Sequence, residues 1–243
     1  MLYGISSNTW LKTAILYTLE EHTEFISSRD LALTIDECSQ STIKKLCREL
    51  QEDIDTAYPN DLMTLIIDQR NGMKLIHKPY VNFQNLLAMI FSKEIAYELL
   101  QQLLLHRTIL TADFCDTYFV SESQLRRKIE TMNDSLAKHD ITISLSKNIT
   151  LLGEEHRLRA FFSAFLFSIH RQFSHIAWIE SKDDYRQTAE IVAKALSLKT
   201  DSQTSEILAV ACFITMDAIE KHWTLFFNEK EQKQLGWSAK RGL

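Results

Sequence analysis

Residues 39–46 read SQSTIKKL, and residues 121–128 read SESQLRRK. When the two stretches are aligned on their first serines, a second serine, a branched apolar residue and a basic pair also coincide. Such a repeat within one chain indicates a duplicated structural unit. The elements predicted around each stretch therefore decide the fold.

The same order of elements surrounds both stretches. Apolar residues at helical spacing predict a first helix, and an apolar pair then precedes a hydroxyl residue, Ser27 or Thr111, that is able to cap a short second helix. A longer third helix opens with the repeated serines and carries an apolar stripe on one face. The predicted helices are 10–21, 28–35 and 39–55 in the first copy, and 92–106, 112–119 and 121–138 in the second.

Alternating apolar residues follow each third helix and predict a hairpin. In the first copy the strands 62–68 and 73–78 flank a turn that contains Asn71-Gly72, which is a strong hairpin signal. In the second copy the strands are 141–145 and 149–152. A hairpin after a three-helix unit is a wing. The predicted fold class is therefore mainly α, with two tandem winged helix-turn-helix domains at residues 1–80 and 81–153.

Residues 154–243 predict a third, helical domain. Apolar side chains at helical spacing indicate helices at 154–173, 185–198 and 204–227. The many aromatic residues of this region fit either a core or a partner interface, and a core is the more common fate of such stripes.

Composition limits the classes of protein that fit. The 243 residues are 45% hydrophobic and include only five Gly and two Pro, which is typical of a helix-rich globular protein. We expect a cytoplasmic location, because no apolar stretch is long enough to cross a bilayer and the first residues do not resemble a signal peptide. The four cysteines occur singly, which favours reduced thiols. The net charge of −5 does not favour a polyanionic partner, so local positive charge has to provide any contact with DNA.

The third helix of each copy is the candidate DNA-reading element. A recognition helix enters the major groove with its N-terminus first, which favours small polar side chains early and cations one turn later. Arg70, Lys74 and Lys147 on the wings are able to contact the phosphate backbone. Ser-x-Ser is also a common helix cap, and a basic pair is also common on a solvated face, but neither explains why both recur together. The predicted DNA-binding residues are Ser39, Gln40, Ser41, Thr42, Lys44, Lys45, Arg48, Ser121, Ser123, Gln124, Arg126, Arg127 and Lys128.

No pattern in the sequence recommends catalysis. We find no glycine-rich phosphate loop, nucleophile elbow or zinc-type ligand spacing, so we expect no enzyme, no metal and no cofactor. His170 and His175 are five positions apart, which would splay them around a helix and prevent joint metal coordination.

The chain resembles the Mga/AtxA-type virulence regulators of Gram-positive bacteria. The resemblance rests on residues 19–54 (LEEHTEFISSRDLALTIDECSQSTIKKLCRELQEDI), on NGMKLI at 71–76, and above all on residues 119–162 (FVSESQLRRKIETMNDSLAKHDITISLSKNITLLGEEHRLRAFF). It covers the first half of the chain strongly and residues 154–227 moderately. It implies two N-terminal winged helices that bind double-stranded DNA, followed by PTS-regulation domains (PRDs), which are helical modules with phosphorylatable histidines.

The resemblance also implies partners and regulation. It implies a PRD-like domain in which His170 or His175 accepts a phosphoryl group from a phosphocarrier protein of the sugar phosphotransferase system; a lone histidine on an apolar helix is otherwise a structural residue. It implies activation of virulence or sugar-responsive genes and possible homo-oligomers. Family members usually continue beyond the equivalent of Leu243, so a truncated product and an abbreviated relative both stay open. The alternative function is a protein-interaction scaffold that forms mixed dimers with longer relatives.

Overall fold

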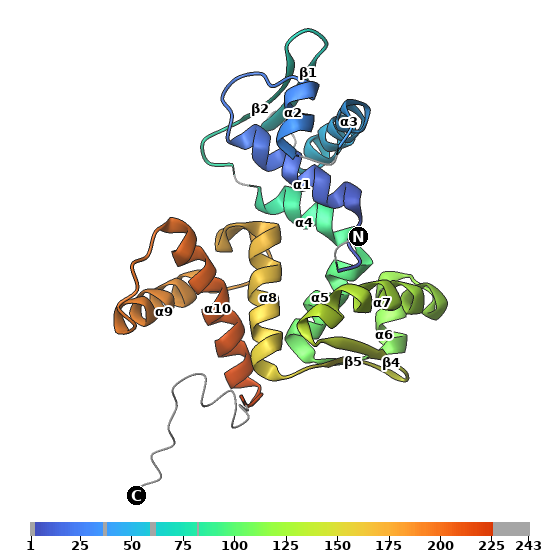
Figure 1. Cartoon of the computed structure of the whole chain (residues 1–243), viewed down its shortest axis with the longest axis vertical. Coiled ribbons are helices and arrows are strands. Elements are labelled where there is room, and N and C mark those ends of the chain that lie inside the picture. The colour runs from blue at the N-terminus through green and yellow to red at the C-terminus, as the bar shows by residue number, and fades with distance from the viewer. Residues whose placement is uncertain (1–2, 36–37, 59–61, 82, 226–243) are drawn as a thin grey trace, which may run out of the picture.

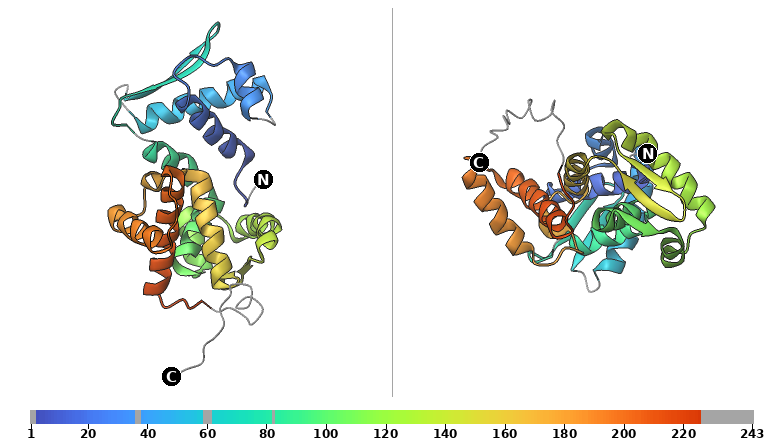
Figure 2. Two further views of the ribbon diagram at one scale, coloured as in Figure 1. Left: turned by 60° about the vertical axis from the view of Figure 1, so that its left-hand side comes forward. Right: turned by 90° about the horizontal axis from the view of Figure 1, so that it is seen from below.

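The protein is mainly helical and has two small antiparallel sheets (Figure 1). The computed structural model describes residues 3–35, 38–58, 62–81 and 83–225. Three groups of elements follow one another along the chain. The first group forms one end of the molecule, while the second and third groups lie beside each other at the other end (Figure 2).

The first group contains α1 (Ser7–Glu20), α2 (Ser28–Ile35), α3 (Gln40–Ala57), β1 (Met63–Asp68) and β2 (Gly72–His77). The two strands form the predicted hairpin, with Leu65 opposite Leu75. Ile26 forms an isolated antiparallel bridge with Met73 of β2, beside the hairpin. Gly72 is required at the turn because its φ is 103° and a Cβ there would collide with the Ile26 carbonyl.

The second group repeats this order after an additional helix. It contains α4 (Gln84–Ser92), α5 (Ile95–His106), β3 (Thr108–Leu110), α6 (Thr111–Tyr118), α7 (Glu122–Leu136), a 3-10 turn η1 (Ala137–His139), β4 (Thr142–Leu145) and β5 (Asn148–Leu152). The sheet order is β3-β5-β4, so β3 pairs with the second strand of the hairpin as Ile26 pairs with β2. Both small sheets are consistent with winged helix-turn-helix units.

The third group is helical. It contains α8 (Glu155–His170), a 3-10 turn η2 (Phe173–His175), α9 (Lys182–Ala195) and α10 (Ser202–Glu220). The aromatic stripe of α8 is buried, with Phe162 and Ile169 almost fully covered. The stripe is therefore core, and part of this core faces α1 and α5. Among the described residues, no helix is long and apolar enough to span a bilayer.

Several predicted boundaries were wrong. The prediction missed α4 entirely, and the helix predicted at 92–106 begins only at Ile95. Thr111 does not cap α6; it is the first residue of that helix, and its hydroxyl donates to the Ser146 carbonyl at 2.8 Å. The helix predicted at 154–173 ends at His170, because the next residue, Arg171, has a φ of 53°. The helix predicted at 204–227 ends at Glu220. The last two predicted positions, 226 and 227, lie outside the described residues.

Candidate nucleic-acid interface

The N-terminus of α3 is capped by the first serine of the repeat. The Ser39 hydroxyl accepts the Thr42 N–H at 3.1 Å and contacts the Ser41 and Thr42 hydroxyls at 2.7 and 2.9 Å. Ser39 therefore fixes where the helix begins, while Gln40 and Ser41 are exposed on its first turn. Thr42 is half-buried. The side chains placed to meet a base edge are those of Gln40 and Ser41.

The N-terminus of α7 has a capping box. The Ser121 hydroxyl accepts the Gln124 N–H at 3.3 Å, and the Gln124 side-chain oxygen accepts the Ser121 N–H at 3.0 Å. This reciprocal pair satisfies two donors that the helix itself leaves open. Ser123 and Gln124 are exposed, and the amide nitrogen of Gln124 faces no protein partner among the described residues. The side-chain amide of Gln124 is therefore free to donate a hydrogen bond to a base or a phosphate.

The cations of α3 lie on its exposed face. Lys44, Lys45 and Arg48 are all exposed, as a contact with DNA requires. Lys45 lies 3.8 Å from Glu49 one turn along the helix. Within the described part of the chain, Lys44 and Arg48 form no ion pair. Exposed pairs of this kind contribute about 0.3–0.5 kcal/mol, so a phosphate would replace Glu49 as the partner of Lys45 at little cost.

The cations of α7 do not all share one environment. Arg126 and Arg127 are exposed, and Arg126 is paired with Glu122 at 3.1 Å. Lys128 departs from the prediction: it is half-buried, and its Nζ donates to the Gly4 carbonyl at 3.0 Å. The three adjacent cations therefore divide into two on the exposed face and one that holds the N-terminal residues against the helix.

Each wing presents a cation near its tip. In the first wing the Asp68 carboxylate accepts the N–H groups of Arg70 and Asn71 at 2.8 and 2.7 Å, and these bonds hold the pKa of Asp68 below its usual value. Arg70 is exposed on this ordered turn, whereas Lys74 lies over the Phe25 ring. Lys147 is exposed at the tip of the second wing. Arg70 and Lys147 are thus the wing cations best placed for phosphate.

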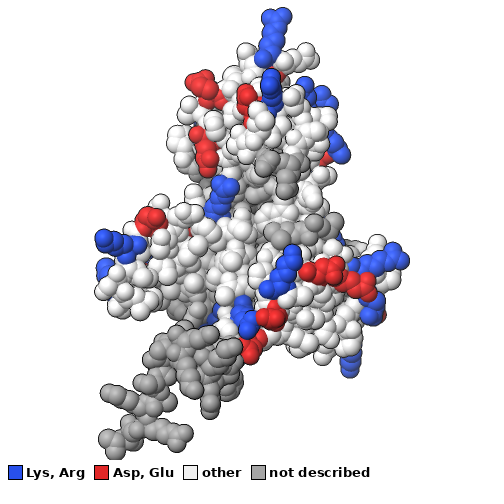
Figure 3. Space-filling view, in the orientation of Figure 1, with Lys and Arg blue, Asp and Glu red and all other residues white. Residues whose placement is uncertain are grey.

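Basic and acidic side chains are mixed over the first and second groups, and several Lys and Arg side chains project from the right-hand side of both in Figure 3. The chain as a whole is acidic, with a net charge of −5. A contact with DNA would therefore depend on the local cations of α3, α7 and the wings, because the described part of the chain has no general basic surface to provide it.

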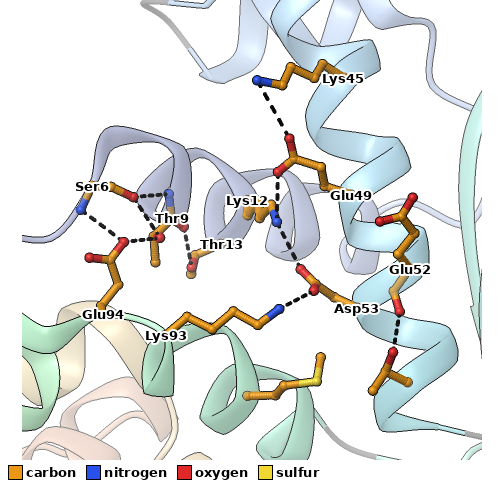
Figure 4. A network of polar contacts seen from close by, with 12 residues as sticks. Ser6, Thr9, Lys12, Thr13, Lys45, Glu49, Glu52, Asp53, Lys93 and Glu94 are labelled. Atoms are coloured by element: carbon orange, nitrogen blue, oxygen red, sulfur yellow. Dashed lines mark hydrogen bonds and ion pairs between the residues drawn. The ribbon is translucent and has the colours of Figure 1, made fainter. Parts of the chain in front are cut away.

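A polar network that sequence reasoning missed joins α3 to the rest of the chain (Figure 4). The Asp53 carboxylate is only 7% exposed and accepts from Lys12 at 3.0 Å and from Lys93 at 2.7 Å. The Glu94 carboxylate accepts the Thr9 hydroxyl at 2.5 Å. These contacts cross 40 to 85 positions of sequence, so no local pattern indicates them.

The two candidate phosphorylation sites lie in the interior. His170 is 1% exposed and His175 is 4% exposed. The His170 Nε2 lies 2.9 Å from the Tyr97 hydroxyl, which also accepts the Trp178 indole N–H at 3.0 Å, and the Tyr17 hydroxyl donates to the His170 carbonyl at 2.8 Å. Burial lowers the pKa of His170 to about 3, so the ring is neutral. The end of α8 is thereby fastened to both α1 and α5.

A second joint connects the wing side of the second group to α8. Arg107 forms an ion pair with Glu155 at 3.0 Å and lies over the Trp223 ring at 4.1 Å. Arg159 donates to the Trp223 carbonyl at 2.6 Å. The third group is therefore packed against the end of α5.

The order α5-β3-α6-α7-β4-β5, with one face of α7 exposed, is consistent with a winged helix-turn-helix. Residues 79–166 match the family model of the Mga helix-turn-helix domain. This match confirms the resemblance over residues 119–162 and is consistent with an Mga-family regulator. The match includes α7 and most of α8 but not α3.

The domain implies DNA binding and transcription regulation, and regulators of this family are typically not enzymes. A search of curated proteins found no match.

Proposed function

We propose that the chain is a sequence-specific transcription regulator with two tandem winged helix-turn-helix domains, at residues 1–80 and 81–153, and a PRD-like helical domain at residues 154–243. In this proposal α3 and α7 enter the major groove of double-stranded DNA. The observation that carries it is the exposed, capped N-terminus that both helices present, each followed one turn later by exposed cations. The recurrence of β-strand pairing around both helices supports the tandem arrangement.

Each candidate residue has a role in this proposal. Ser39 and Ser121 position the helices as caps, and Thr42 supports the first cap. Short polar side chains on the first turns read base edges, and the following cations contact phosphates, which set the register of the protein on the duplex. The base-reading residues are Gln40, Ser41, Ser123 and Gln124, and the phosphate-contacting residues are Lys44, Lys45, Arg48, Arg126 and Arg127.

The helical domain carries the regulatory part of the proposal. The resemblance supports activation of virulence or sugar-responsive genes, with a phosphocarrier protein as a partner and His170 or His175 as the phosphoryl acceptor. Both rings are buried in the present conformation, so phosphorylation requires α8 and η2 to separate from α1 and α5. Incubation with phosphocarrier and labelled phosphoenolpyruvate tests this part: label on either histidine supports it, and a protein without label refutes it.

Salt dependence of DNA binding tests the central part. A duplex is first selected from a random-sequence pool with the wild-type chain, and its affinity is then measured by fluorescence anisotropy over a range of salt concentrations. If Arg126 and Arg127 each neutralise one phosphate, replacing both with alanine makes the fall of log K with log salt less steep, by about 2 units of slope. The matched control is Lys194→Ala/Lys199→Ala, which removes the same charge from exposed positions in the third group and should leave the slope unchanged.

A protein-interaction scaffold is the second candidate function. It is favoured by large apolar side chains exposed on α9 and α10, namely Ile191 at 67% and Ile219 at 61%. A chain that selects no duplex, or that binds DNA equally at all salt concentrations, would support the scaffold and overturn the regulator.

A further inference from the structure

The first helix of the second group, α4, is packed against the first group as well as against α5. α4 lies against α1 and α3, with Leu86, Leu87 and Phe91 fully buried. Only Lys93 and Glu94 separate α4 from α5, which is the first helix of the second helix-turn-helix. These two residues, between α4 and α5, lie close to α1 and α3 of the first group (Figure 4).

Lys93 fixes this point to α3. Its Nζ donates to Asp53 at 2.7 Å, and the other carboxylate oxygen of Asp53 accepts from Lys12 of α1 at 3.0 Å. A carboxylate that is 7% exposed is stable only when its charge is paired. Asp53 thus ties α3 to Lys93, the residue that directly follows α4.

Glu94 fixes the same point to the start of α1. It is 8% exposed, and one of its oxygens accepts both the Thr9 hydroxyl at 2.5 Å and the Ser6 N–H at 3.2 Å. Lys93 and Glu94 are neighbours in sequence and contact different helices of the first group, each through a partner or carboxylate that is buried, although the Lys93 side chain itself is exposed. Rotation of α5 relative to that group would break both sets of contacts together.

The N-terminal residues form a second connection, this time to α7. Lys128 of α7 donates to the Gly4 carbonyl at 3.0 Å, and Ile5 is fully buried. Gly4 has a φ of 80°, and a Cβ there would lie 2.5 Å from the Met132 side chain of α7. The Tyr3 hydroxyl lies 3.0 Å from His139, just beyond the end of α7. The segment before α1 is thus in direct contact with the second recognition helix.

We infer that Asp53, Glu94 and Gly4 are positioning residues that hold α3 and α7 at one separation and angle, so that the chain recognises a single composite site with two half-sites at a fixed spacing. The inference rests on the proposed function and adds the geometry of the DNA target to it. Two independently tethered modules would tolerate different spacings. A rigid pair does not, because inserted base pairs move one half-site along the duplex and rotate it around the helix axis.

Insertions in the selected duplex test the inference. We expect the wild-type chain to lose at least about 100-fold in affinity when about five base pairs, half a helical turn, are inserted between the half-sites, since one complete set of base contacts is lost. The variant Asp53→Asn/Lys93→Ala removes the contact that ties α3 to the junction, while Lys12 keeps Glu49 as a partner at 3.0 Å. Its affinity for the original and the extended duplex should differ by less than about tenfold.

The matched control for this variant is Asp55→Asn, the same change at an exposed position of α3. It should keep the wild-type sensitivity to insertion. Equal affinity of the wild-type chain for both duplexes would overturn the inference and leave the proposed function intact. An unchanged ratio in the Asp53→Asn/Lys93→Ala variant would overturn the assignment of Asp53 as a positioning residue.

A measurement without DNA separates the inference from the proposed function. Spin labels at Glu52→Cys on α3 and Glu130→Cys on α7, both exposed positions, report the distance between the helices once the half-buried Cys38 and Cys115 are replaced by serine. We expect one narrow distance distribution in the otherwise wild-type chain and a broad one after Asp53→Asn/Lys93→Ala. A broad distribution before that change would overturn the inference even if DNA binds, and failure to select any duplex would count against the proposed function.

Discussion

Acidification should destabilise the protein through His170, the histidine that fastens α8 to α1 and α5. Burial lowers the pKa of His170 to about 3, and the charges of His175 and Lys182 act in the same direction. In the unfolded chain this histidine has an ordinary pKa near 6.5. Between about pH 6.5 and about pH 3 it is therefore protonated in the unfolded chain and neutral in the folded chain. Because the unfolded state binds more protons over this range, the free energy of unfolding falls as the pH falls.

The size of the effect follows from the two pKa values. Each pH unit between about 6.5 and about 3 removes about 1.4 kcal/mol, so His170 alone lowers the free energy of unfolding by about 2 kcal/mol between pH 7 and pH 5. His175 adds to this loss, since burial lowers its pKa as well.

Urea denaturation followed by circular dichroism at the two pH values measures the loss. His170→Gln should be less stable than wild type at pH 7, since it disturbs the contact with Tyr97, but should lose about 2 kcal/mol less between pH 7 and pH 5. The matched control is His22→Gln, which changes an exposed histidine and should keep the wild-type pH dependence. If His170→Gln and wild type lose equal stability over this range, His170 is not held neutral by burial and the reasoning is refuted.

Three further changes test the packing of the recognition helices. Gly4→Ala should lower the free energy of unfolding by about 1–3 kcal/mol, because φ is 80° and the new Cβ overlaps a side chain of α7; urea denaturation with no loss would contradict the close approach. Leu125 in α7 is 1% exposed, so Leu125→Ala should lower the free energy of unfolding by about 2–5 kcal/mol. Arg127 is exposed, so Arg127→Ala should change it by no more than about 0.5 kcal/mol. Equal losses in the two variants would contradict the burial of one face of α7 and the exposure of the other. Cys47 should react with a thiol reagent only after unfolding, since burial raises its pKa to about 12; rapid labelling of the native protein, detected by mass spectrometry, would show that α3 is not packed as described.

The helices α3 and α7 could be predicted from sequence because their signals are local. Ser39 and Ser121 cap helices that carry an apolar stripe of the expected period, and the Asn-Gly turn specifies the first hairpin. α4 was missed because its N-cap position, Phe83, makes no side-chain cap, and its apolar run gave no clear polar face. Local signals therefore predict the elements that are bounded by caps and turns.

The contacts between the groups could not be predicted. Asp53 and Lys93 are 40 positions apart, and Glu94 and Thr9 are 85 positions apart. In the sequence Lys128 continues the basic pair before it, and only the fold brings the Gly4 carbonyl to its ammonium. A charged residue on a helix therefore gives no sign, by itself, of whether it faces DNA or another part of the chain.

The central claim is that both recognition helices read the major groove, and methylation interference tests it most directly. The selected duplex is methylated with dimethyl sulfate, which modifies guanine N7 in the major groove and adenine N3 in the minor groove, and protein-bound and free molecules are then compared. The account predicts that N7 methylation in two separate clusters prevents binding and that N3 methylation between them does not. Interference only from adenine N3, or from no base at all, would contradict it.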